Sequence, residues 1–301
     1  MNDLSETVIF NREKSLLEKE LVFNQRLKEK YYGNPWGRVI TNLYLKRKCF
    51  TKRYGFRQRT PKSKTQIPAF IEQYQINTEE IELPVSEYCN FNEFFTRRLK
   101  PSARPVHPEP GALISPADSR LLVTGISAEV QLRVKGREYG FAELIQEREL
   151  IKNYMNGVCL VLRLIPADYH RFCYLDDGYH GPIVSIKGHY HASAPKPLIT
   201  QHFPLYHRNY REYCVLHTKR FGAVIQIEVG AMTVGKIVQN KRLGGEFHKG
   251  EEKGCFEYGA STIILLFEPN TIVIDQDIQS YSQQGIETLV KYGSHIGYKN
   301  I

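Results

Sequence analysis

The sequence lacks any long run of apolar residues. Its longest runs, VCLVL and TIILLF, are far shorter than the roughly 20 residues that a membrane-spanning helix needs. An apolar core of a secretory signal is also missing, and the six cysteines contain no C-x-x-C pair. We therefore expect reduced thiols in a cytosolic compartment, and a protein that meets a membrane, if at all, from one side.

Acidic residues are absent between positions 31 and 71, where ten Lys or Arg residues lie. The formal net charge of +9 is therefore concentrated in this segment, and the rest of the chain is close to neutral. Such a segment favours the phosphates of nucleic acid or of anionic lipid. Because no nucleic-acid recognition motif accompanies it, we expect an anionic membrane surface as the partner and no nucleic acid.

Residues 36–50 place apolar side chains at helical spacing, which predicts an amphipathic helix. Four cations lie off its apolar stripe or directly after it: Arg38, Lys46, Lys48 and Lys52. This pattern is expected of a helix that lies in a lipid interface, and we assign the four cations to membrane binding. The same stripe would also suit packing against the protein's own core, and the sequence leaves that alternative open.

The chain changes in texture near residue 110. Before it, residues 12–30 are rich in Glu, Lys, Leu and Arg and predict a helix, and residues 67–76 predict a short one. After it, short β-like runs predict strands at 121–126, 158–165, 182–187, 213–217, 223–229, 262–267 and 271–275. We predict an α+β fold with a mainly β catalytic core and N-terminal amphipathic helices. A basic, membrane-associating helical region would span 1–75, and a β-rich catalytic domain would span 76–301.

The stretch AVIQIEV (223–229) shows the alternation of a strand with two different faces. Ile225, Ile227 and Val229 share one face. Gln226 and Glu228 share the other, which the alternation predicts to be the polar face.

Four stretches hold titratable or nucleophilic side chains among Pro, Gly and aromatic residues. They are FNEFFTRRLKPSARPV (91–106), ISPADSRLLV (114–123), LIPADYHRFCYLDDG (164–178) and KGEEKGCFEYGASTIILLFE (249–268). Catalytic groups are disproportionately found on such loops. Taken singly, each has an ordinary explanation: Asp118 as a turn residue, His170 as a half-buried imidazole, and Arg97 with Arg98 as surface charge.

Taken together, and with VGAMTVGKI (229–237), these strings resemble the phosphatidylserine decarboxylase family in its shorter bacterial form. The resemblance implies a decarboxylase that makes its electron sink from its own serine. The Ser261 hydroxyl would attack the carbonyl of Ala260 and split the chain into a β chain, 1–260, and an α chain, 261–301. The α chain would then begin with a pyruvoyl cofactor derived from Ser261, which forms a Schiff base with the amine of the substrate.

The resemblance also implies roles for three further residues. In the family, an Asp from SPAD and the second His of YHRxH activate the serine, and the first His serves decarboxylation. Asp118 and His170 match, whereas the string YHRFC puts Cys173 at the position of the relay His. A thiol, with a usual pKa near 8.5, could take that role only if a neighbour lowered its pKa. His170 could act instead, and so could His189 or His191.

The activity that the resemblance implies is conversion of phosphatidylserine to phosphatidylethanolamine in phospholipid biosynthesis. The enzyme would be peripheral to the cytoplasmic side of a bacterial membrane, and a homodimer is usual for the family. Two alternatives stay open: a lipid-binding homologue that does not cleave itself, because Cys173 and Ala260 depart from the family pattern, and a decarboxylase of a soluble amino acid. We expect no metal, since His189 and His191 have no third ligand at the spacing of a zinc motif.

Overall fold

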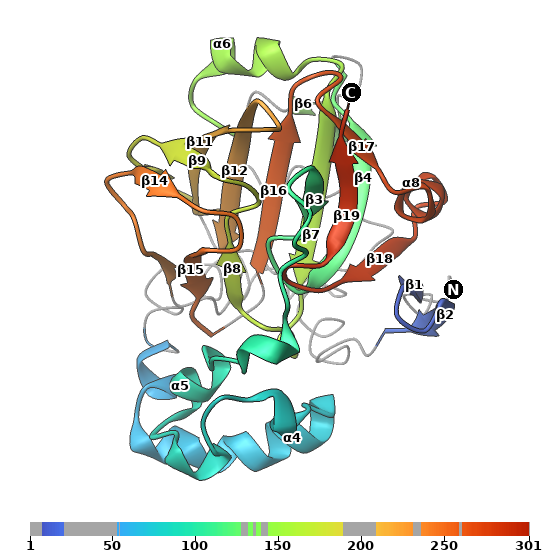
Figure 1. Ribbon diagram of the computed structural model, residues 1–301. Coiled ribbons are helices and arrows are strands. Elements are labelled where there is room, and N and C mark those ends of the chain that lie inside the picture. Colours follow the sequence, from blue (N-terminus) through green and yellow to red (C-terminus); the bar gives the residue numbers. More distant parts are fainter. Residues whose placement is uncertain are drawn as a thin grey trace.

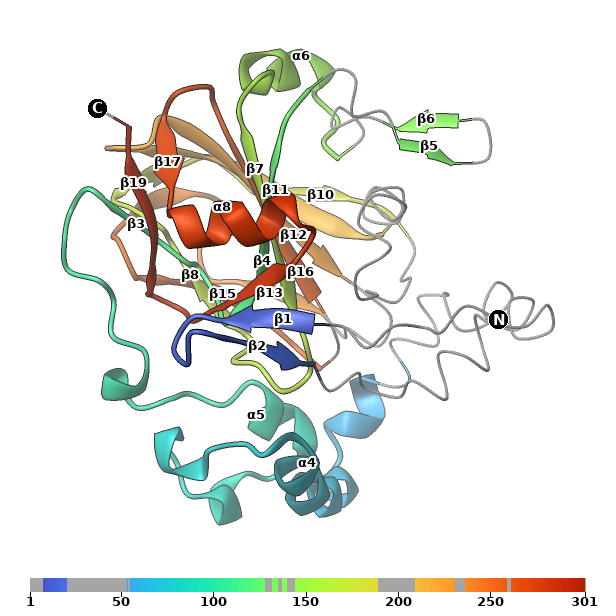
Figure 2. The same cartoon turned by 90° about the vertical axis from the view of Figure 1, so that its right-hand side faces the viewer.

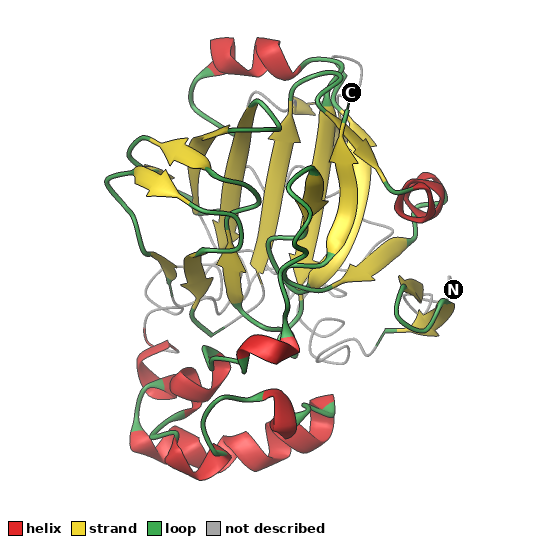
Figure 3. Cartoon of the chain, viewed as in Figure 1, coloured by secondary structure: helices red, strands yellow, loops and turns green. Residues whose placement is uncertain are grey.

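The computed structural model describes residues 8–20, 53, 55–127, 132–134, 137–139, 144–188, 209–230, 236–258 and 261–300. Strands make up the upper part of the molecule in Figure 1, and short helices lie below one end of the sheets. Figure 3 shows the same separation by colour, with the lower helices in red and the strands in yellow. The predicted α+β class with a mainly β core is confirmed.

The largest sheet has eleven strands within the described residues. In spatial order it contains β14 (Gly245–Phe247), β9 (Gly178–His180), β11 (Arg211–Thr218), β12 (Ala223–Gly230), β16 (Ser261–Phe267), β7 (Val158–Leu164), β4 (Ser119–Gly125), β18 (Glu287–Val290), β1 (Val8–Asn11) and β2 (Leu16–Lys19), with β10 (Val184–Ile186) beside β11. The pairing is antiparallel except between β1 and β18. Strand β16, which begins with Ser261, is thus central.

Smaller elements cover this sheet. One three-stranded sheet contains β13 (Ile237–Gln239), β15 (Glu252–Phe256) and β8 (Arg171–Cys173); another contains β17 (Ile272–Ile274), β19 (His295–Lys299) and β3 (Ala112–Ile114). A separate hairpin pairs β5 (Leu132–Val134) with β6 (Arg137–Tyr139). The helical elements are η2 (Pro61–Gln66), α4 (Ile67–Tyr74), η3 (Thr78–Glu80), η4 (Val85–Glu87), α5 (Phe91–Phe95), η5 (Pro101–Ala103), α6 (Arg148–Ile151), η7 (Lys152–Tyr154) and α8 (Gln276–Gln283). Figure 2 shows α8 and the hairpin of β1 and β2 on one side of the molecule.

Strand β16 is buried on both of its faces. Ile263, Leu265 and Phe267 belong to a core cluster shared with the smaller sheets. Ile264 and Leu266 belong to a second cluster on the opposite face of the large sheet. The apolar run TIILLF therefore forms a fully covered strand, and the predicted strand at 262–267 is confirmed.

The polar face of β12 is buried as well. Ile225, Ile227 and Val229 lie in the second core cluster, as their alternation predicts. Gln226 and Glu228 point away from that cluster but do not reach solvent. The Lys253 ammonium donates to Glu228 Oε1 at 2.7 Å and to Gln239 Oε1 at 3.0 Å. A buried ion pair therefore ties β12 to β15 across the two layers.

The N-terminal helix predicted over residues 12–30 is wrong for its described part. Residues 12–19 form a turn and the strand β2, and the hairpin of β1 and β2 joins the large sheet through β18. Arg12 pairs with Asp275 and Asp277, each at 2.7 Å. These tertiary contacts outweigh the helix propensity of the segment. Residues 21–30 lie outside the described residues.

The other helical predictions have two outcomes. The predicted helix at 67–76 is confirmed as α4, which ends at Tyr74 because Gln75 adopts a left-handed φ of 51°. The amphipathic segment 36–50 lies outside the described residues, together with Arg38, Lys46, Lys48 and Lys52. Among the helices that the structure describes, none has the length and apolar character to cross a bilayer.

Candidate active site

Ser261 is the first residue of the central strand. It pairs with Gly230 at the end of β12 and with Leu164 at the end of β7. In Figure 1, β16 starts at the end of the sheet that lies nearest α5. The side chain of Ser261 is fully buried, and no group among the described residues hydrogen-bonds its Oγ. A buried hydroxyl without a partner is costly, so its presence at this position calls for an explanation.

The loop that leaves β7 folds back on itself beside this strand end. The amide of Ile165 donates to Asp168 Oδ2 at 2.6 Å, and the carbonyl of Ile165 lies 3.0 Å from His170 Nε2. Arg120 Nη1 donates to both carboxylate oxygens of Asp168. Burial raises the pKa of Asp168 to about 6, although Arg120 opposes that rise. The loop thus holds His170 against Ile165, which is one residue beyond Leu164, where β7 pairs with Ser261.

His170 is a buried, neutral imidazole. Its ring stacks on Phe95 with centroids 4.1 Å apart, and Phe95 packs edge-on against Tyr258, three residues before Ser261. Because a carbonyl oxygen only accepts hydrogen bonds, Nε2 carries the proton and Nδ1 keeps its lone pair. Within the described residues Nδ1 has no partner. Burial, and then the charge of Arg97, lower the pKa of His170 to about 3.

Asp118 is buried and accepts hydrogen bonds at both of its carboxylate oxygens. Arg104 donates to both of its oxygens at 2.7 to 3.0 Å, and the amide of Tyr292 donates to Oδ1 at 2.8 Å. Arg104 also donates to Glu80 at 2.9 Å. The contacts described for Asp118 therefore connect it to an arginine and to a backbone amide, and the printed sequence gives no sign of the part played by Tyr292.

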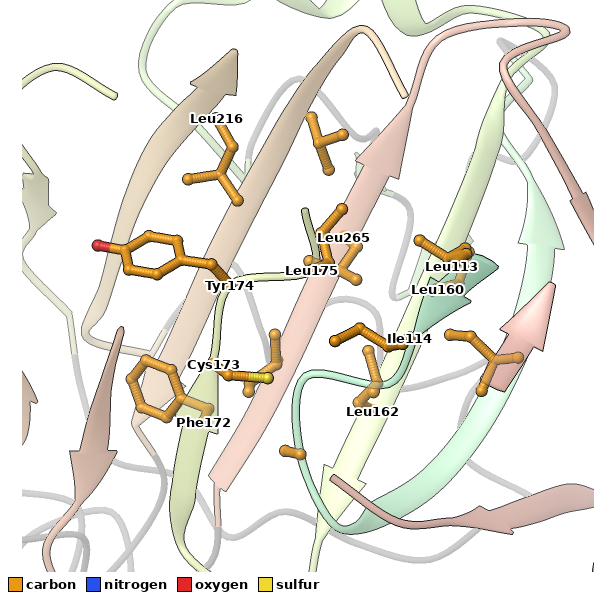
Figure 4. Close-up of a cluster of buried hydrophobic side chains, with 14 of the residues drawn as sticks. Leu113, Ile114, Leu160, Leu162, Phe172, Cys173, Tyr174, Leu175, Leu216 and Leu265 are labelled. Atoms are coloured by element: carbon orange, nitrogen blue, oxygen red, sulfur yellow. The ribbon is translucent and has the colours of Figure 1, made fainter. Parts of the chain in front are cut away.

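Cys173 is part of the hydrophobic core. It lies at the end of β8, and Figure 4 shows it among apolar side chains that include Ile114, Leu162 and Phe172. Burial raises the pKa of the thiol to about 12, although a hydrogen bond with Tyr292 opposes the rise. Such a thiol stays protonated near neutral pH and cannot take a proton from serine. The geometry therefore favours a packing role for Cys173.

The two arginines of FFTRR differ sharply. Arg97 is 5% exposed, whereas the Arg98 side chain is 61% exposed. The ordinary explanation of the pair as surface charge therefore holds for Arg98 and is wrong for Arg97. Helical spacing does not tell them apart, because both arginines follow the end of α5 and both stand three positions after one of its buried Phe residues.

The surroundings of Ser261 are compatible with a serine side chain that reacts without leaving its position at the start of β16. Its hydroxyl is sequestered from solvent and, among the described residues, has no competing partner. Gly259 and Ala260, which precede it, lie outside the described residues. The described part of the chain holds no group of three or more His, Cys, Asp or Glu side chains arranged for a metal, and His189 and His191 lie outside it.

The fold has a mainly β core, and the loop that holds His170 lies at the end of the central strand that Ser261 begins. The model of the family described as phosphatidylserine decarboxylase matches residues 91–298. The chain belongs to this family and is a decarboxylase.

Three relatives illustrate how far the similarity extends. The phosphatidylserine decarboxylase proenzyme of Clostridium botulinum (strain Kyoto / Type A2) is 39% identical over 292 residues, which cover 96% of this chain and 98% of that protein. The protein of the same name from Clostridium novyi (strain NT) is 39% identical over 293 residues, covering 97% and 99%. Phosphatidylserine decarboxylase proenzyme 2 of Clostridium acetobutylicum is 39% identical over 292 residues, covering 93% and 98%.

Proposed function

We propose that this chain is a self-processing proenzyme whose mature form converts phosphatidylserine to phosphatidylethanolamine. The observation that carries the proposal is the buried hydroxyl of Ser261, which has no hydrogen-bond partner within the described residues and begins the central strand beside the loop of a neutral histidine. The relatives are named proenzymes, which supports a processing step.

The processing step needs one proton acceptor and one molecule of water. Ser261 Oγ attacks the carbonyl carbon of Ala260, its proton passes to a base, and the Ser261 nitrogen leaves as an amine, so the amide becomes an ester. Elimination across Cα and Cβ of Ser261 then releases the carboxylate of Ala260. Water replaces the nitrogen of the resulting dehydroalanine and frees ammonia. The α chain would thus begin with a ketone next to an amide.

His170 is the base that the geometry favours for the first step. A neutral imidazole whose Nε2 is fixed on the carbonyl of Ile165 presents the lone pair of Nδ1. Cys173 is protonated and packed in the core. We assign Asp118 to the placement of the SPAD loop, because Arg104 and the amide of Tyr292 satisfy its carboxylate.

In the mature enzyme the pyruvoyl group from Ser261 would supply the electron sink that decarboxylation requires. The protein's own residues would exclude water and return a proton to the substrate carbon. His170 is a titratable group that contacts of the described loop hold near this strand end. Peripheral contact with the cytoplasmic side of the membrane would rest on Arg38, Lys46, Lys48 and Lys52.

The proposal is tested by intact mass spectrometry of the purified protein. We expect two species, residues 1–260 and residues 261–301 with a blocked N-terminus. Ser261→Ala should give one folded, inactive, full-length chain, because only the nucleophile is removed. Thr262→Val, which removes the neighbouring buried hydroxyl, is the matched control and should still be cut.

Borohydride added together with phosphatidylserine should leave lipid covalently attached to the α chain. A wild-type chain that stays whole and releases no carbon dioxide would favour the alternative of a lipid-binding homologue that does not cleave itself. The observation behind that alternative is the protonated, buried Cys173 at the relay position.

A further inference from the structure

The guanidinium of Arg97 is buried, and the residues that the structure describes do not supply it with a full set of acceptors. Its Nη2 donates to the carbonyl of Ala167 at 3.2 Å, and its plane lies near the ring of Phe94. Among the described residues no group accepts a hydrogen bond from Nε or Nη1. An arginine offers five N–H donors in a fixed fork, so the described residues leave most of this fork without an acceptor.

Two carboxylates that influence Arg97 do not accept its free N–H groups. Asp118 and Asp168 both contribute to the electrostatic environment of Arg97, but each is already engaged by another arginine. Arg104 occupies both oxygens of Asp118, and Arg120 occupies both oxygens of Asp168. A buried cation without a direct counter-ion is destabilising, and a bound anion would offset that effect.

Arg97 also lies close to the proposed reacting centre. Ala167, which holds its Nη2, belongs to the same loop as Ile165 and His170. The charge of Arg97 is the largest single electrostatic influence on the His170 imidazole. An anion bound by Arg97 would therefore lie near a substrate that reacts beside His170.

We propose that Arg97 binds the phosphodiester of the lipid substrate, an inference that rests on the proposed function. Two anionic groups of phosphatidylserine could meet this guanidinium, the phosphodiester and the serine carboxylate. The carboxylate loses its charge as carbon dioxide leaves, so an arginine that held it would stabilise the ground state and oppose the reaction. The phosphodiester keeps its charge throughout, so binding it positions the head group without that penalty.

Binding is measured by calorimetry on the unprocessed Ser261→Ala chain, so that processing is not required. The phosphate probe is glycerophosphoethanolamine, which has no carboxylate, and the carboxylate probe is free serine. We expect the phosphate probe to bind, and Arg97→Gln to weaken it about 10- to 100-fold, the range that a charge-assisted hydrogen bond supplies. Arg98→Gln removes the adjacent, exposed guanidinium and should leave binding unchanged.

A second arm uses the processed enzyme with phosphatidylserine in mixed micelles. Arg97→Gln should raise KM about 10- to 100-fold and change kcat much less, because the contact is the same in the ground and transition states. Arg97→Lys keeps the charge but loses the forked guanidinium, so its KM should lie between those of the wild-type and Arg97→Gln enzymes. This variant keeps the test informative if Arg97→Gln does not fold.

Three results would overturn the assignment. Arg97-dependent binding of serine alone would give the site to the carboxylate. A fall in kcat without a change in KM would mean that Arg97 acts on the chemical step through His170. Unchanged probe binding and KM in a folded Arg97→Gln chain would leave Arg97 a structural residue. Failure of the wild-type chain to cleave, with Arg97-dependent binding of the phosphate probe intact, would count against the proposed function alone.

Discussion

The buried imidazole of His170 should make the fold sensitive to mild acid. Its pKa in the fold is about 3, against about 6.5 in an unfolded chain. The fold thus favours the neutral ring, and stability is fully present above pH 6.5 and is lost as pH falls from 6.5 toward 3. At pH 5 the unfolded state binds nearly one extra proton, which lowers the free energy of unfolding by about 2 kcal/mol.

The assay is urea unfolding at pH 7.5 and pH 5 on the unprocessed Ser261→Ala chain, with and without His170→Gln. Gln can still donate to the carbonyl of Ile165 but does not titrate. We expect the pH-dependent loss to be about 2 kcal/mol smaller in the His170→Gln chain, since the carboxylates are common to both. His217→Gln, on the exposed face of β11, controls for loss of a histidine as such. Equal losses in all three chains would refute a buried, neutral His170.

Two further predictions concern Cys173, which stands at the position of the relay histidine, and the basic segment 31–71. Cys173→His should speed chain cleavage by about 10²-fold or more, since an imidazole suits proton transfer near neutral pH, at a cost of about 1–3 kcal/mol for overpacking beside Tyr292. Mass spectrometry over time and urea unfolding measure the two effects, and an unchanged cleavage rate would leave the base at His170. Binding to phosphatidylglycerol vesicles should fall steeply with added salt, and replacing Lys46, Lys48 and Lys52 by Gln should weaken it. Equally tight sedimentation with neutral vesicles would contradict the electrostatic part of that idea.

The strands could be predicted because their signal is local. Alternation and apolar runs located β12, β7 and β16 to within two residues at each end. The hairpin of β1 and β2 could not be predicted in this way, because it is held by pairing with β18, more than 260 residues later in the chain. Leu16 and Leu17, which suggested a helix, are exposed on β2.

The candidate site was predictable only as a set of residue types. The motifs identified Asp118, His170 and Ser261, and the described loops bring their segments to one end of the large sheet. Which cation is buried could not be read from FFTRR, since Arg97 and Arg98 differ only in the direction that their side chains take from the chain. The alternation in β12 predicts a polar face but not its burial, which depends on Lys253 reaching Glu228 from another layer.

The central place of β16 has a consequence for the protein after a cut before Ser261. The shorter fragment would hold β16 between β12 and β7, and β18 between β4 and β1, so each strand would keep neighbours from the longer fragment on both edges. The two fragments could not dissociate without breaking four ladders of backbone hydrogen bonds in the large sheet. A single translation product would thus yield a lasting heterodimer, in which a new chain terminus lies inside the structure instead of at its surface.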